Sequence, residues 1–149
     1  MSAEFFLDTN ILLYSFDKAD LRKKQIAETL VDQAATSGSG VISSQVCQEF
    51  CNVMLSKNAD DIPLPKLVNY LETVLFGLIR IYPSPAQYLE ALRIHKQTQY
   101  RFYDSLIVAA AIESGASILY SEDLQHERHI GPLQIINPFS GNAEPQLGR

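Results

Sequence analysis

The chain has 149 residues, of which 46% are hydrophobic and 19% charged, a composition typical of a globular domain rather than of a disordered segment. Its 12 basic and 17 acidic residues give a net charge of −5, which argues against a broad basic surface that grips nucleic acid. The charge does not exclude a nuclease, because carboxylates that hold a divalent cation also make a protein acidic. The sequence has no apolar run long enough to cross a bilayer and no secretion signal, so we expect a cytoplasmic protein.

Short apolar runs alternate with segments of helical spacing. Asp20 and the pair Ser84-Pro85 mark helix starts, and Gly115 marks a helix end. In chain order, the first half predicts a strand at Glu4–Leu7, helices at Ile11–Tyr14 and Asp20–Ala35, a strand at Val41–Ile42, a helix that begins at Ser43 or Ser44, and a loop at Asn58–Pro63. The second half predicts a helix at Leu67–Leu78, a strand at Arg80–Tyr82, helices at Pro85–Lys96 and Tyr103–Glu113, and strands at Ile118–Tyr120 and Leu133–Ile136.

This alternation indicates an α/β fold, a three-layer α/β/α sandwich around a mainly parallel sheet. We expect one domain at residues 1–139 and a flexible C-terminal tail at residues 140–149. Cys47 and Cys51 lie one helical turn apart and point the same way, so we interpret them as reduced, packed thiols. A metal or redox role for the pair is the minority alternative.

Acidic residues stand where sites form in parallel sheets, beyond the carboxyl ends of the strands. Asp8 and Asp123 follow predicted strands, Glu49 lies on the helix after the second strand, and Asp104 opens a later helix. Four unpaired carboxylates at one edge would repel each other, and a divalent cation would relieve that repulsion. Carboxylate oxygens suit Mg²⁺ or Mn²⁺ better than zinc, so we expect one of these ions as the cofactor.

Each acid alone has an ordinary structural explanation. Asp8 and Asp123 could cap helices, Asp104 could be favoured by a helix dipole, and Glu49 could be solvated. However, Glu49 adjoins an apolar stripe and so points partly inward, where a carboxylate needs a partner. The joint placement of the four acids at one edge favours the metal site.

Other candidate residues give weaker signals. His126 and His129 have the spacing of a metal-ligand pair on a helix, but no third ligand stands nearby, and a surface pair is the better interpretation. Arg101 is flanked by Tyr100 and Phe102, which could stack on RNA while the arginine positions it. The same rings could equally be packed surface aromatics.

Four segments resemble one known family when they are taken together in order. They are FFLDTNILLY around Asp8, SSQVCQEF around Glu49, YRFYDSLIVAAA around Asp104 and LYSEDLQ around Asp123. The chain is similar to the PIN-domain ribonucleases, a group that includes VapC-type toxins of bacterial toxin–antitoxin pairs. The resemblance extends to about Phe139.

The resemblance implies that the four acids are the catalytic and metal-binding residues. Asn10 and Ser121 match polar positions that orient water or substrate, and the implied partners are a second copy of the chain and a small antitoxin protein. Two apolar segments, Ile26–Val31 and Leu67–Leu78, are the expected docking surfaces. The sequence departs from the family pattern at Glu127, where glycine is expected after His126.

The expected activity is metal-dependent endonucleolytic hydrolysis of RNA, with the chain as the toxin of a toxin–antitoxin pair. One alternative is a non-catalytic RNA-binding or adaptor domain, although all four acids are present. A second is a phosphatase of the haloacid dehalogenase type, which uses Asp-x-Asp. Asn10 stands in place of its second acid and counts against it.

Overall fold

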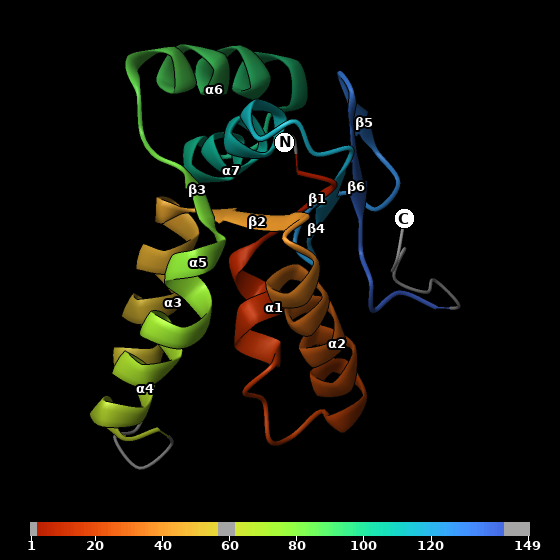
Figure 1. Ribbon diagram of the computed structural model, residues 1–149. Helices are drawn as coiled ribbons and strands as arrows, with labels where there is room; N and C mark the ends of the chain where they lie inside the picture. Colours follow the sequence, from red (N-terminus) through yellow and green to blue (C-terminus); the bar gives the residue numbers. More distant parts are fainter. Residues whose placement is uncertain (1–2, 57–61, 142–149) are drawn as a thin grey trace.

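A six-stranded sheet forms the middle layer of the computed structural model, which describes residues 3–56 and 62–141 (Figure 1). The strand order is β3-β2-β1-β4-β6-β5, and neighbouring strands are parallel except for β5 and β6. The strands are β1 (Phe5–Leu7), β2 (Gly40–Ser43), β3 (Ile79–Ile81), β4 (Ile118–Tyr120), β5 (His129–Ile130) and β6 (Leu133–Ile136).

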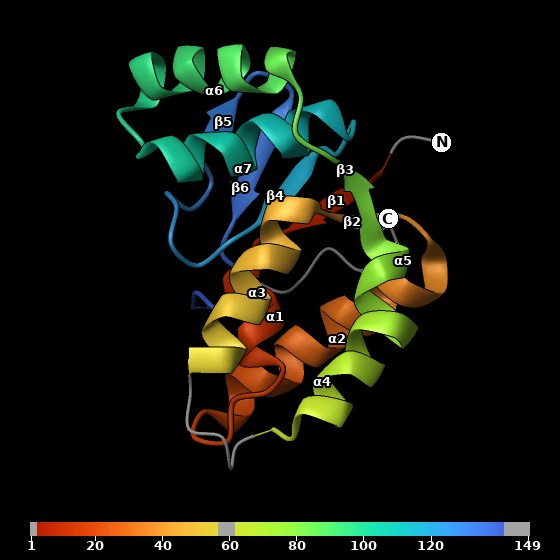
Figure 2. The ribbon, with the colours of Figure 1, turned by 90° about the vertical axis from the view of Figure 1, so that its left-hand side faces the viewer.

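Helices cover both faces of this sheet, with α6 and α7 on one side and α1 and α2 on the other (Figures 1 and 2). The three-layer α/β/α sandwich with a mainly parallel sheet is therefore confirmed. The helices are α1 (Thr9–Tyr14), α2 (Leu21–Ser37), α3 (Ser44–Ser56), α4 (Leu64–Tyr70), the π-helical turn η1 (Leu71–Leu75), α5 (Phe76–Leu78), α6 (Pro85–Thr98) and α7 (Phe102–Glu113).

The central strand β1 is apolar throughout because helices lie above and below it. Phe6 and Leu7 are fully buried, and the backbone N–H of Asp8 extends the pairing by donating to the carbonyl oxygen of Tyr120 in β4 at 3.0 Å. Gly40 pairs with Phe5, and a Cβ at position 40 would lie 2.4 Å from the Phe5 ring. Only glycine lets β2 approach β1 this closely.

The strands β1, β2, β4 and β6 and the helices between them agree with the prediction to within a few residues. Sequence analysis missed β5, whose two residues pair antiparallel with β6 across the turn at Gly131, because such a short strand has no periodic signal. The helix expected at Leu67–Leu78 begins at Leu64 and contains a π-helical turn. The third strand begins at Ile79, one residue earlier than expected.

The prediction that the segment Ile26–Val31 forms a docking surface is wrong. In α2, Ala27, Leu30 and Val31 are buried in the protein's own core, so their apolar side is not available to a partner. The segment Leu67–Leu78 is also largely used internally, although Val68 and Phe76 are exposed. Apolar spacing reports burial in general and does not separate a core from an interface.

Both cysteines are free thiols, as predicted. Burial raises the pKa of Cys47 to about 11, which makes its thiol a poor nucleophile at neutral pH. No helix within the described residues is long and apolar enough to span a membrane. Of the predicted tail, residues 142–149 lie outside the described residues, so its flexibility stays a prediction.

Glu127 stands where the family pattern has glycine, and this difference affects the backbone. The backbone of Glu127 has a φ of +67°, in the left-handed region that favours glycine. Its backbone N–H donates to the carbonyl oxygen of Ile135 at 2.7 Å, which fixes this turn against β6. A side chain is therefore held in a conformation that costs about 1 kcal/mol for an L residue.

We expect Glu127→Gly to raise the free energy of unfolding by about 1 kcal/mol, because glycine adopts this φ without strain. The measurement is urea unfolding of both proteins. Glu28→Gly, at an exposed position within α2, is the control and should lower the free energy of unfolding by about 1 kcal/mol. A loss of stability in Glu127→Gly would contradict the strain argument.

Candidate metal centre

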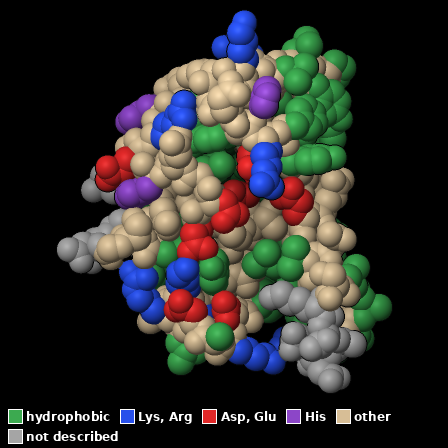
Figure 3. All heavy atoms as spheres, turned by 180° about the vertical axis from the view of Figure 1, so that it is seen from behind, with side chains coloured by type: hydrophobic (Ala, Val, Ile, Leu, Met, Phe, Trp, Pro, Cys, Tyr) green, Lys and Arg blue, Asp and Glu red, His purple; other side chains and the backbone are tan. Residues whose placement is uncertain are grey.

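The four predicted acids line one pocket at the carboxyl edge of the sheet. Asp8 directly follows β1, Glu49 lies on the helix after β2, Asp104 is in the first turn of α7, and Asp123 follows β4. The pocket has a volume of about 340 Å³ and is lined by all four carboxylates. Acidic side chains accordingly gather on one face of the molecule (Figure 3).

Asp8 is the most buried of the four, with 7% of its surface exposed. One carboxylate oxygen accepts from the backbone N–H of Thr9 at 2.7 Å and so caps α1. The other accepts from the hydroxyl of Ser121 at 2.8 Å and from the amide of Asn10 at 3.4 Å. These contacts fix the carboxylate between two strands and the first helix.

Glu49 is held from two sides. The hydroxyl of Thr9 donates to its Oε1 at 2.7 Å, and the amide of Gln45 donates to its Oε2 at 3.2 Å. Gln45 also donates to the carbonyl oxygen of Tyr103 in α7 at 3.1 Å, so one side chain joins α3, α7 and the acidic pocket. The half-buried position of Glu49 agrees with the inward orientation inferred from its apolar neighbours.

Asp123 is exposed and is held through short polar side chains. The amide of Asn10 donates to its Oδ2 at 3.1 Å, and its own backbone N–H donates to Ser121 Oγ at 3.3 Å. Because Ser121 and Asn10 also contact Asp8, the structure places both predicted polar residues between the first and last acids.

Asp104 is half-buried at the start of α7. Burial, followed by the charges of Asp123 and Glu49, raises the pKa of its carboxyl, and the charge of Arg101 opposes that shift. Arg101 is exposed at the N-terminal end of α7, and its guanidinium is a cation whose charge acts on Asp104.

The electrostatics of the pocket centre on Asp8. Burial, with smaller contributions from the charges of Glu49 and Asp123, raises the pKa of its carboxyl to about 7, although hydrogen bonds from Ser121 and Thr9 favour the ionised form. A shift of this size makes the ionised carboxylate less favourable by about 4 kcal/mol. A cation in the pocket would reverse that penalty.

The donor set fits a hard divalent cation, since oxygen atoms of carboxylates line the pocket and one carboxylate is desolvated. Within the described residues, however, no three Asp, Glu, His or Cys side chains are gathered closely enough to hold a metal ion as they stand. The amide of Asn10 lies between Asp8 and Asp123 instead. Binding of a cation by several of these acids would therefore require side-chain rotations that exchange these hydrogen bonds for metal ligation.

The weaker candidates are engaged elsewhere. His126 accepts from the backbone N–H of Asn137 at 2.9 Å, and His129 lies in β5, so the two do not share a helix face. The Tyr100 ring lies 5.4 Å from the Arg128 guanidinium, while Phe102 lines a separate pocket. The two rings beside Arg101 thus have different neighbours, and their role toward RNA stays a prediction.

Sequence analysis missed two residues that hold the site. Thr9 and Gln45 both hydrogen-bond to Glu49. Gln45 carried a signal, because it stands four residues before Glu49 on one helix and so shares its face. Thr9 carried none, since its partner lies 40 positions away in the chain.

The PIN domain family model matches residues 5–130 of this chain. This range contains all four acids of the pocket. No curated protein sequence matches the chain significantly.

Three solved structures are similar to this fold. The FitAcB structure from Neisseria gonorrhoeae has a TM-score of 0.62 at 18% identity, covering 91% of this chain and 99% of its own. VapC20 of Mycobacterium tuberculosis, described as a toxin that cleaves the sarcin–ricin loop, has a TM-score of 0.59 at 18% identity, with coverages of 80% and 90%. VapBC2 of Rickettsia felis, bound to a fragment of promoter DNA, has a TM-score of 0.57 at 21% identity, with coverages of 88% and 96%.

The raised pKa of Asp8 predicts a pH-dependent stability in the presence of a chelator. Since the folded-state pKa of about 7 exceeds the ordinary pKa of 3.8 for an aspartate, the folded state binds the proton more tightly, and the free energy of unfolding falls as pH rises from about 4 to about 7. Asp8→Asn removes this titrating group. As pH rises over that range, the free energy of unfolding of the variant should therefore increase relative to that of the unmodified protein, by up to about 4 kcal/mol.

Urea unfolding in EDTA across this pH range measures the difference. Asp32→Asn, which neutralises an exposed carboxylate of α2, is the matched control for the change in net charge. A stability difference between Asp8→Asn and the unmodified protein that stays constant with pH would show that Asp8 is not desolvated in solution.

Proposed function

This chain belongs to the PIN domain family and brings four carboxylates into one pocket, and on that basis we propose that it is a metal-dependent endoribonuclease, the toxin of a toxin–antitoxin pair. The observation that carries the proposal is the buried carboxylate of Asp8 beside three further acids. None of the described residues that line the pocket is a lysine or arginine, and a divalent cation would supply the positive charge that stabilises the ionised Asp8.

The four carboxylates Asp8, Glu49, Asp104 and Asp123 would hold Mg²⁺ or Mn²⁺. Such an ion, when bound, lowers the pKa of water and neutralises negative charge on a phosphoryl group.

The chain's own residues would position this site. Thr9 and Gln45 orient Glu49, and Ser121 and Asn10 join the first acid to the last. Arg101, an exposed arginine whose charge acts on Asp104, would offer a cation to the phosphate backbone of a bound RNA.

An acidic pocket repels RNA until a cation fills it. The net charge of −5 and the four clustered carboxylates make the metal a condition for substrate binding as well as for chemistry. The similarity to VapC20, described as a toxin that cleaves the sarcin–ricin loop, supports the proposal of a nuclease toxin.

A non-catalytic RNA-binding role is the alternative, and it predicts binding without cleavage. The family assignment removes the basis for the haloacid dehalogenase alternative. That chemistry needs a second acid at position 10, where this chain has Asn10, whose amide donates to both Asp8 and Asp123.

A small antitoxin remains the proposed protein partner, and the cytoplasm is the proposed location.

We also propose that a second copy of the chain binds an exposed apolar patch on α6 and the start of α7. Leu89 and Leu92 are 70% and 54% exposed, a large fraction for apolar side chains of a soluble domain. The patch contains Tyr82, Tyr88, Leu89, Leu92, Phe102 and Tyr103. It replaces the surfaces expected from sequence, and hydrophobic side chains gather over this part of the molecule (Figure 3).

Cleavage of a labelled RNA under single-turnover conditions tests the proposed activity. We expect Mn²⁺-dependent cleavage that EDTA abolishes, and a loss of at least about 100-fold in Asp8→Asn and Asp104→Asn, because each removes a charged ligand of one metal centre. Glu49→Gln and Asp123→Asn should also lower the rate. The control is Asp32→Asn, and melts of every variant establish that the fold is kept. Equal cleavage in EDTA and Mn²⁺ would exclude the metal mechanism, and RNA binding without cleavage would favour the adaptor alternative.

Light scattering after size exclusion tests the apolar patch. The unmodified chain should have the mass of a dimer, and Leu89→Glu combined with Leu92→Glu should give a monomer, because charges at the centre of an apolar interface are strongly unfavourable. Leu64→Glu, at a 61% exposed leucine outside the patch, is the control and should remain dimeric. A dimeric double variant would exclude this face.

A further inference from the structure

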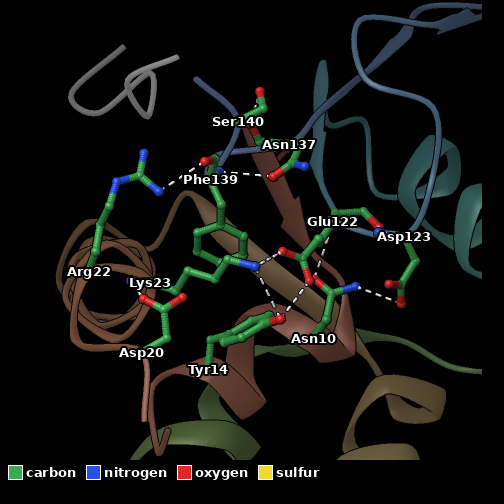
Figure 4. Close-up of polar contacts among 11 residues, drawn as sticks. Asn10, Tyr14, Asp20, Arg22, Lys23, Glu122, Asp123, Asn137, Phe139 and Ser140 are labelled. Atoms are coloured by element: carbon green, nitrogen blue, oxygen red, sulfur yellow. Dashed lines mark hydrogen bonds and ion pairs between the residues drawn. The ribbon is translucent and has the colours of Figure 1, made fainter. Parts of the chain in front are cut away.

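The residue next to Asp123 points away from the acidic pocket. Glu122 reaches from the loop after β4 into a polar cluster on α1 and α2 (Figure 4). The hydroxyl of Tyr14 in α1 donates to Glu122 Oε1 at 2.7 Å, and Lys23 Nζ in α2 forms an ion pair with Glu122 Oε2. The side chains of the pair are only 25% and 24% exposed.

Lys23 is enclosed by aromatic rings as well as paired. Its ammonium lies 4.7 Å from the centre of the Tyr14 ring and 5.5 Å from that of Phe139. The Arg22 guanidinium donates to the carbonyl oxygen of Phe139 at 3.0 Å, which holds the C-terminal segment over the lysine. Partial exclusion of water strengthens the ion pair relative to one on the open surface.

The same loop is tied to the acidic pocket through Asn10. The backbone N–H of Glu122 donates to Asn10 Oδ1 at 3.2 Å, while Asn10 Nδ2 donates to Asp123 Oδ2 at 3.1 Å. Asn10 and Tyr14 lie four residues apart on α1, so one face of this helix contacts the loop at two points. The side chain of Glu122 thus adds a contact to α1 and α2 beside the hydrogen bonds of Asn10 and Ser121 that already hold the backbone next to Asp123.

We propose that Lys23 and Glu122 are positioning residues that hold Asp123 at the metal site, an inference that rests on the proposed function. The loop that carries Asp123 has no regular secondary structure, and Asp123 itself is exposed. Without Lys23, Glu122 would have no cation to compensate its charge and would keep only the hydroxyl of Tyr14 as its side-chain partner. The ion pair therefore turns one acid of the loop toward α2 and leaves the other facing the pocket.

Mn²⁺ binding measured by calorimetry on the full chain tests this role without relying on activity. We expect Lys23→Met and Glu122→Gln each to weaken Mn²⁺ binding by about 10-fold, as loss of an outer support of a metal site does. Lys23→Arg keeps the charge and should stay within about twofold of the unmodified chain. Arg93→Met, which breaks the exposed ion pair with Glu90 on α6, is the matched control and should leave the affinity unchanged.

A double-mutant cycle separates positioning from general destabilisation. If Lys23 acts through Asp123, then Lys23→Met in an Asp123→Asn background should change Mn²⁺ affinity by less than about twofold. Exchange of the Glu122 amide hydrogen should be faster in Lys23→Met, while melts in EDTA show that the fold is kept.

The same loss of affinity in both backgrounds, or Mn²⁺ binding by Lys23→Met as tight as that of the unmodified chain, would overturn the positioning role. Failure of the unmodified chain to bind Mn²⁺ would instead overturn the proposed metal site itself, and with it the inference.

Discussion

The buried carboxylate of Asp8 is the constraint on which the surrounding structure depends. It ends the central strand, caps α1 through the backbone N–H of Thr9, and accepts from Ser121 of the neighbouring strand connection. A neutral cap such as asparagine would serve the helix as well, yet the position holds an acid whose pKa is raised to about 7 by burial. The fold therefore keeps a carboxyl group where its ionised form is unfavourable, and the cation that we propose would stabilise that ionised form.

Parallel pairing is what gathers the other acids around it. Since β1, β2 and β4 run in the same direction, the residues that follow them emerge at one edge of the sheet. Asp123 and Glu49 reach the pocket in this way, and Asp104 joins them because α7 packs against the sheet. Short polar side chains such as Asn10 then fix the spacing between acids that repel each other.

The loop after β4 compensates the negative charges of two adjacent acids in different ways. Glu122 is neutralised inside the protein by Lys23, whose ammonium also contacts two aromatic rings. Asp123 has an amide as its partner, which compensates the charge only weakly. Adjacent acids with such different partners agree with the different roles that we propose for them, Glu122 in positioning the loop and Asp123 at the metal site.

The sequence by itself determined the fold class and the identity of the four acids in the pocket. Alternating strands and helices with caps at Asp20 and Ser84 are local signals, and they agree with the structure because burial of both sheet faces makes the strands uniformly apolar. The positions of Asp8 and Asp123 after strands were enough to place them at one edge, since strand direction fixes that edge.

Only the tertiary structure decided which side chains hold those acids and which surface stays exposed. The contacts of Thr9 with Glu49 and of Lys23 with Glu122 join residues 40 and 99 positions apart, and no local pattern reports such distances. The same holds for α2, whose apolar residues from Ile26 to Val31 have the spacing of an interface but pack into the core. Periodicity reveals that a face is buried, whereas what buries it depends on segments brought together by the fold.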